Sequence, residues 1–206
     1  MKKLLFIISS ILLCCCQQKT DNDTITTKGE LPLNVRIARD STTLSLPKRK
    51  QLLEKGLEEL NLTKNDSIYL ENLSKVSLIS IRLKDSLLFR KVNNQVYQEA
   101  LKKENYKVLG ESQWDLAVYY KQKSTLDSAY YYYRKAYQHF AQMPIDSTSK
   151  SLKARMLYSM GQMQEDFKDY LGAEANITKA IRIYDDLEDT RRLQYSYNVL
   201  GVISSA

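Results

Sequence analysis

Hydrophobic residues recur at helical spacing over most of the chain, and residues 127–140, "DSAYYYYRKAYQHF", give the clearest case. Ala129, Tyr133, Ala136 and Phe140 follow the i, i+4, i+7, i+11 spacing that places side chains on one face of an α-helix. The four consecutive tyrosines therefore belong to a predicted helix, in which only Tyr133 points squarely inward.

A β-strand and a base-stacking surface are the two alternatives for this tyrosine run. Strand alternation would place tyrosines on both faces, and "RKAYQHF" has no period of two. Stacking on nucleic acid would need basic side chains on the same face, where only Arg134 and Lys135 are available. Asp127 and Ser128 can accept hydrogen bonds from free amides of a first helical turn, so we expect the helix to begin there.

The same alternation of small and large residues returns 44 residues further along the chain. The repeated positions are Ala173, Ile177, Ala180 and Tyr184. A further helix is expected just before each of these two, around Leu116–Tyr120 and Leu157–Phe167. A third start lies in "LQYSYNVLGVISSA", where Tyr197, Leu200 and Gly201 match Leu157, Met160 and Gly161 at a displacement of 40 residues. Helical hairpins that recur at such a period predict a solenoid.

Residues 47–106 are less regular but are also predicted to be helical. The stretch "LPKRKQLLEKGLEEL" predicts one helix, and the segments on either side of Asp85 predict a divergent hairpin. The pair Asp85-Ser86 lies 42 residues before Asp127-Ser128. We interpret both pairs as helix caps and not as catalytic groups, because no histidine or second acid is placed to activate either serine.

These residues resemble the tetratricopeptide repeat. The segments "YSMG" (158–161) and "NVLG" (198–201) carry the Leu-Gly step of that family's first helix, with Met160 replacing leucine in one of them. The residues expected at the family's packing positions are Ala129, Tyr133, Ala136, Gly161, Ala173, Ala180 and Gly201. The chain departs from the family in its longer spacing, about 34 residues being usual. The resemblance implies an all-α, right-handed superhelical solenoid of antiparallel helix pairs.

The first sixteen residues, "MKKLLFIISSILLCCC", predict an export signal. Lys2 and Lys3 precede an apolar run, residues 4–13, that is shorter than the roughly 20 residues of a membrane-spanning helix. The segment resembles a bacterial lipobox, which implies lipidation of Cys16 or, as second choice, Cys15. Plain secretion is an alternative, whereas adjacent cysteines lack the spacing that a zinc site needs.

The sequence therefore predicts four regions. They are a signal peptide over residues 1–15, a flexible tether over 16–46, a divergent helical region over 47–106 and repeats over 107–206, the last repeat incomplete. The tether is rich in Thr, Asn and Asp and shows no period, with at most a short extended piece around Val35. The expected location is the cell envelope, on the exported side of the membrane to which the lipid holds the chain.

Charge and composition argue against several other classes of function. The net charge is +7, but basic and acidic residues are interleaved and the only dense basic cluster is residues 48–50, so no nucleic-acid binding by this segment is expected. His139 is the only histidine, and no phosphate-binding glycine motif is present. We expect no catalytic residue, no metal and no cofactor.

The family resemblance further implies a concave face, lined by the first helix of each pair, that binds a protein or peptide. On this register the groove residues are Trp114, Val118, Lys121, Tyr158, Gln162, Glu165 and Asn198. The alternative for Trp114 and Tyr158 is packing between helices. A second functional hypothesis is the input domain of a longer signalling protein, a sensor histidine kinase or a helix-turn-helix regulator. It is based on similarity to the N-terminal sensory parts of such proteins of the Bacteroidetes type.

Overall fold

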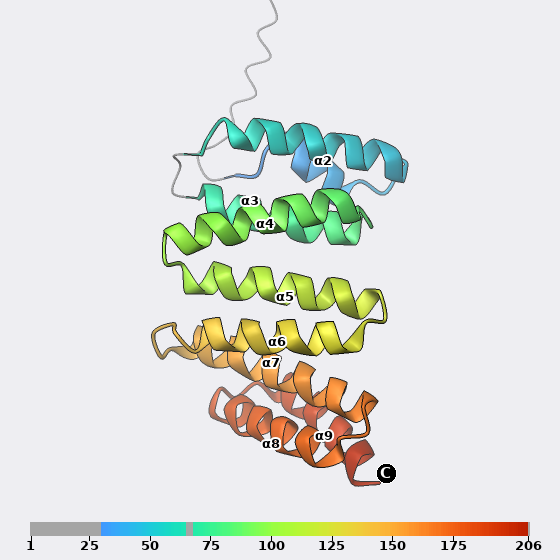
Figure 1. Ribbon diagram of the computed structural model, residues 1–206, viewed down its shortest axis with the longest axis vertical. Coiled ribbons are helices and arrows are strands. Elements are labelled where there is room, and N and C mark those ends of the chain that lie inside the picture. The colour runs from blue at the N-terminus through green and yellow to red at the C-terminus, as the bar shows by residue number, and fades with distance from the viewer. Residues whose placement is uncertain (1–29, 65–67, 206) are drawn as a thin grey trace, which may run out of the picture.

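The computed structural model describes residues 30–64 and 68–205, and within these two ranges it contains nine α-helices and no strand (Figure 1). The helices are α1 (Leu33–Asp40), α2 (Leu46–Asn61), α3 (Tyr69–Arg82), α4 (Ser86–Lys102), α5 (Tyr106–Gln122), α6 (Leu126–Phe140), α7 (Ser147–Asp166), α8 (Tyr170–Asp186) and α9 (Thr190–Ser204). The prediction of an all-α fold is confirmed for these residues. Cys15, Cys16 and the predicted signal peptide lie outside them.

Helices α2 to α8 follow one another along the long axis of the molecule, with α1 packed beside α2 and α9 beside α8 (Figure 1). Each helix contacts the next one in sequence, and α3 also contacts α5, while α7 also contacts α9. Buried side chains of α1 to α4 and the start of α5 form one hydrophobic cluster, and those from the end of α5 to α8 form a second. Residues of α7, α8 and α9 complete the packing at the far end.

Helix α1 lies inside the segment that was expected to be a flexible tether, and that expectation differs from the structure here. Val35 and Ala38 are fully buried, and the Val35 side chain fits against Gly56 of α2. Residues 33–40 form only two turns and bury two positions, which is too few for a helical period to be visible in the sequence.

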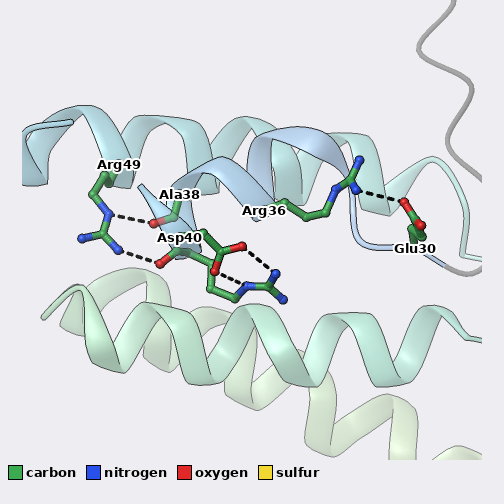
Figure 2. A network of polar contacts seen from close by, with 6 residues as sticks. Glu30, Arg36, Ala38, Asp40 and Arg49 are labelled. Atoms are coloured by element: carbon green, nitrogen blue, oxygen red, sulfur yellow. Dashed lines mark hydrogen bonds and ion pairs between the residues drawn. The ribbon is translucent and has the colours of Figure 1, made fainter. Parts of the chain in front are cut away.

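The C-terminus of α1 is held by a side chain of α2 (Figure 2). Arg49 donates from Nε to the carbonyl oxygen of Ala38 at 2.8 Å and from Nη2 to that of Arg39 at 2.9 Å. These two carbonyls belong to the last turn of α1, where no amide of the same helix can reach them. The guanidinium therefore satisfies backbone acceptors of α1 and fixes this short helix to α2.

A recurrent turn separates most of the later helices. The residue before the N-cap has a positive φ, between 50° and 61°, at Lys84, Glu104, Ser124, Lys168 and Glu188. Successive turns are 20 residues apart from Lys84 to Ser124, and again from Lys168 to Glu188. The N-cap side chain then accepts a hydrogen bond from the amide three residues later, at 3.0 to 3.1 Å, at Asp85, Asn105, Asp169 and Asp189. The helix pairs thus share one junction geometry.

The expected cap at Asp127 and Ser128 differs from the structure. Helix α6 begins at Leu126 with Thr125 as its N-cap residue, so Asp127 lies in the first turn. Thr125 is 40 residues after Asp85, whereas the two Asp-Ser pairs are 42 apart. The resemblance between the two pairs therefore reflects local composition and not the register of the fold.

Several small residues lie at contacts between helices. Four alanines are fully buried, namely Ala129, Ala136, Ala173 and Ala180. The larger Tyr133 is also buried, with 4% of its surface exposed. A Cβ at Gly161 would lie 2.7 Å from Cγ1 of Ile177, so α7 and α8 approach closely at this point.

Gly201 differs from its expected packing role. It is exposed on α9, and a Cβ there would meet no atom within 4 Å. The face of α9 that carries Gly201 has no neighbouring helix in the described part of the chain, so no close approach requires a glycine at this position.

Candidate functional site

Alternate helices of the stack line two adjoining cavities, which together we call the groove. The α7–α9 cavity has a volume of about 470 Å³ and is lined by Trp114, Arg155, Tyr158, Ser159, Tyr184, Asp189, Arg191, Arg192 and Tyr195. The α3–α5 cavity has about 460 Å³ and is lined by Glu71, Ser74, Lys75, Leu78, Arg82, Lys107, Glu111, Trp114, Asp115, Val118 and Arg155. Trp114 and Arg155 line both cavities, so the two adjoin at this pair. All but Tyr184 and the cap residue Asp189 come from α3, α5, α7 and α9.

Trp114 of α5 and Arg155 of α7 form the boundary between the two cavities. The guanidinium carbon lies 4.0 Å from the centroid of the indole ring, within the range of a cation–π interaction. Burial, together with the positive charge of Arg192, lowers the pKa of Arg155. Among the described residues no carboxylate forms an ion pair with Arg155.

The start of α9 supplies the remaining charges of the α7–α9 cavity. Asp189 accepts a hydrogen bond from the backbone amide of Arg192 at 3.1 Å and also pairs with the guanidinium of Arg192. The Arg191 guanidinium carbon lies 5.9 Å from the centroid of the Tyr195 ring. This cavity therefore contains three guanidinium groups and one carboxylate.

Tyrosines form much of the apolar wall of the same cavity. Burial raises the pKa of Tyr184 to about 12 and also raises the pKa of Tyr158. Both phenols are therefore neutral at physiological pH. Gln162 donates from Nε2 to the Tyr158 hydroxyl at 3.3 Å, so the ring has a polar contact on its own helix.

The α3–α5 cavity contains a carboxyl group that is held mostly away from water. Burial raises the pKa of Asp115 to about 7, although Ser77 donates a hydrogen bond from Oγ to its Oδ2 at 3.1 Å. Asn93 of α4 donates from Nδ2 to Ser77 Oγ at 3.3 Å and to the carbonyl oxygen of Ser112 at 3.0 Å. This polar chain links α3, α4 and α5 directly below the groove.

The α3–α5 cavity contains a second carboxyl group, that of Glu111, whose charge is partly balanced by Lys107. Burial raises the pKa of Glu111, while the positive charge of Lys107 opposes the shift. The Lys107 Nζ lies 3.8 Å from Glu111 Oε1. The α3–α5 cavity thus carries charges of both signs, in contrast to the arginine-rich α7–α9 cavity.

The structure brings together some of the expected groove residues and leaves others apart. Trp114 and Tyr158 line the α7–α9 cavity, and Val118 joins Trp114 in the α3–α5 cavity. Gln162 contacts Tyr158. Four of the seven line neither cavity, namely Gln162, Lys121, Glu165 and Asn198.

Trp114 and Tyr158 each contact the hydrophobic interior and a cavity. Trp114 and Tyr158 are half-buried and pack against the second hydrophobic cluster, yet each also lines the open cavity. Both rings therefore take part in packing, and within the cavity the Trp114 ring is covered by the Arg155 guanidinium.

Sequence reasoning missed the charged residues of the site, namely Arg155, Arg191, Arg192 and Asp115. Arginine on a helix is ordinarily solvated, and its spacing alone does not reveal that two helices, α7 and α9, direct arginines into one cavity. The signal that was available is Asp115 itself, a carboxylate that directly precedes Leu116 and Ala117 in an apolar segment.

The described residues form an all-α protein in which alternate helices line a groove on the surface. A scan of protein-family models and a search of curated proteins each gave no match to this chain. Within residues 30–64 and 68–205, no helix has both the length and the hydropathy of a membrane span. The same residues contain no group of three or more His, Cys, Asp or Glu side chains arranged to hold a metal ion.

His139 lies outside the groove. Its ring contacts Tyr97 of α4 edge-on, with 6.3 Å between centroids, and burial lowers its pKa. A neutral imidazole at the boundary between two helices is consistent with a packing role.

Proposed function

We propose that the chain is a peptide- or protein-binding module, a right-handed solenoid of tetratricopeptide type whose groove holds an extended peptide segment. The observation that carries this proposal is the origin of the groove, because its lining comes almost wholly from α3, α5, α7 and α9. These are the first helices of successive pairs on the register of the repeat. The contacts of α3 with α5 and of α7 with α9, and the junctions 20 residues apart, support the same assignment.

The chemistry of the groove suits a peptide. Trp114, Tyr158 and Tyr195 offer aromatic contact area, which is enriched at protein interfaces. Ser159 can exchange hydrogen bonds with a peptide backbone, and the two cavities are each large enough for one or two side chains. The role proposed is binding and requires no cofactor.

Selection from a displayed library of random peptides tests this function. We expect the intact chain to enrich a peptide motif, and Tyr158→Ala and Trp114→Ala to lose its binding with only a small fall in thermal midpoint. Val118→Lys adds a charge to the groove without removing buried packing, and it should also abolish binding. Tyr131→Ala, on an exposed ring of α6, is the matched control and should bind normally.

Two outcomes would contradict this assignment. One is binding that survives both Val118→Lys and Tyr158→Ala, which would place the ligand elsewhere. The other is a large fall in thermal midpoint for Trp114→Ala and Tyr158→Ala while Val118→Lys still binds, which would assign both rings to packing alone.

We further propose that the module is exported and held at the membrane through a lipid on Cys16. The support is the sequence of the first sixteen residues, with two lysines, a short apolar run and Leu13 three positions before Cys16. Metabolic labelling with a clickable fatty acid should mark the wild-type chain and Cys15→Ser, but not Cys16→Ser. Label on Cys16→Ser that is lost in Cys15→Ser would assign the anchor to Cys15, and no label in any of them would contradict the lipid anchor.

A further inference from the structure

We propose that the α7–α9 cavity binds a group with two negative charges carried on an apolar moiety. The shared chemistry is that of a phosphate monoester or of two adjacent carboxylates. The inference rests on the proposed function, in that the group would belong to the peptide held in the groove, and it adds the class of side chain that this cavity selects.

The charges that line the cavity do not balance. Arg155, Arg191 and Arg192 contribute three positive charges, and Asp189 is the only carboxylate in the lining. Asp189 is already engaged, since it pairs with Arg192 and accepts the backbone amide of the same residue. In the described residues no carboxylate forms an ion pair with the guanidinium of Arg155 or of Arg191, although Glu111 and Asp189 act on them from a greater distance. A group of charge −2 would neutralise these two guanidinium groups.

The geometry of Arg155 favours an anion over other occupants. Its guanidinium carbon lies over the Trp114 ring, 4.0 Å from the ring centroid, and its N–H groups have no hydrogen-bond acceptor among the described residues. A guanidinium edge offers two parallel N–H donors, which match the oxygens of a phosphate or a carboxylate. Burial and the nearby Arg192 disfavour the positive charge of Arg155 more than Tyr184 and Glu111 favour it, and the charge of a bound anion would offset this imbalance.

The N-terminus of α9 is not what would attract an anion to the cavity. The amide of Arg192 in its first turn is already capped by Asp189. Any anion in the cavity is therefore bound by the arginine side chains rather than by the helix terminus.

The rest of the lining predicts an apolar carrier for the charge. Trp114, Tyr158, Tyr184 and Tyr195 supply aromatic surface around the three arginines. The volume of about 470 Å³ is in the range of small-ligand sites and admits an aromatic ring with its substituent.

Trp114 is the only tryptophan of the chain and lies in the cavity, so its fluorescence reports on binding directly. Four probes share one ring and differ in charge: phenyl phosphate, phthalate, benzoate and benzyl alcohol. We expect saturable changes with the first two, roughly tenfold weaker binding of benzoate because one charge is missing, and no binding of benzyl alcohol.

Three single variants localise the effect. Arg155→Gln and Arg191→Gln should each weaken binding of the dianions roughly tenfold, as expected for loss of one charge-assisted contact. Arg134→Gln removes an equal charge from the exposed face of α6 and should bind as the wild type does. Calorimetry replaces fluorescence for Arg155→Gln, because that substitution changes the surroundings of Trp114.

The two dianions separate the possible sources of the charge. Tighter binding of phenyl phosphate indicates a phosphorylated residue, and tighter binding of phthalate indicates paired acidic side chains. The inference is wrong if benzoate or benzyl alcohol binds as tightly as the dianions, if both cavity variants bind normally, or if Arg134→Gln loses as much affinity. Selected peptides that occupy the groove without any dianion binding would leave the proposed function standing and overturn only this inference. Dianion binding without any selected peptide would support the dianion site and contradict the proposed peptide-binding function.

Discussion

Gly110 of α5 lies directly against the ring of Phe140 in α6. A Cβ atom at position 110 would lie 2.5 Å from Cδ1 and 2.7 Å from Cζ of that ring. Both distances are far below van der Waals contact, and Phe140 is fully buried, so its ring has no free space into which to move. The packing of α5 on α6 therefore requires glycine here.

We predict that Gly110→Ala lowers the free energy of unfolding by about 1 to 3 kcal/mol, because overpacking outweighs the helix propensity of alanine. Gly201→Ala is the matched control and should raise it by about 0.5 kcal/mol, since a Cβ there meets nothing within 4 Å. Urea unfolding measures both changes. A neutral or stabilising Gly110→Ala would contradict the close approach of α5 and α6.

The two Asp-Ser pairs should respond differently to substitution. Asp85 accepts the amide of Leu88 at 3.0 Å as the N-cap of α4, so Asp85→Ala should cost about 1 kcal/mol. Asp127 lies in the first turn of α6 and is not its cap, so Asp127→Ala should cost less than about 0.5 kcal/mol through the helix dipole alone. Equal costs in chemical denaturation would mean that α6 begins at Asp127 after all.

Helix α1 should contribute measurably to the fold. Val35→Ala removes two fully buried methyl groups and should lower the free energy of unfolding by about 2 kcal/mol. Ile37→Ala, on the exposed side of the same helix, should cost less than about 1 kcal/mol. If residues 33–40 were instead a free tether, both variants would unfold at the same urea concentration as the wild type.

Stability should depend on pH through Asp115. Its pKa is about 7 in the folded protein against a usual value of 3.8, so the folded state binds this proton more tightly than the unfolded state. The carboxyl therefore favours folding fully below about pH 3.8, and this contribution is lost as pH rises through about 7.

Asp115→Asn isolates that contribution, because it keeps an acceptor for Ser77 and removes the titration. We expect the variant to be more stable than the wild type at pH 8, by on the order of 2 kcal/mol, and the difference to vanish near pH 4. Unfolding of both proteins across this range measures the difference directly. A difference that does not vary with pH would assign Asp115 an ordinary pKa.

Much of the helical layout was predictable from the sequence. The spacing of Ala129, Tyr133, Ala136 and Phe140 determines a buried face, because helical period and burial are two expressions of the same geometry. The exposed Tyr131 follows from the same wheel. Helix starts were less predictable. An Asp-Ser pair can cap a helix or lie one turn inside it, and only the positive φ at Ser124 establishes which applies to α6.

The groove was predictable only in part. Trp114, Val118 and Tyr158 were predicted from the outward face that the family resemblance implies, and each of them lines a cavity. Arg155 and Arg191 were not predicted. Their proximity depends on how α5, α7 and α9 are spaced, and the sequence of one helix does not indicate that spacing.

The serial contacts between helices have a consequence for how quickly the chain reaches its native state. Each helix contacts mainly the one before and the one after it, so few contacts join segments that are distant in sequence. Proteins of low contact order cross a small entropic barrier, because only short loops must close before contacts form. Folding can therefore start at any adjacent pair and spread outward, with a relaxation time in the microsecond to millisecond range typical of helical proteins.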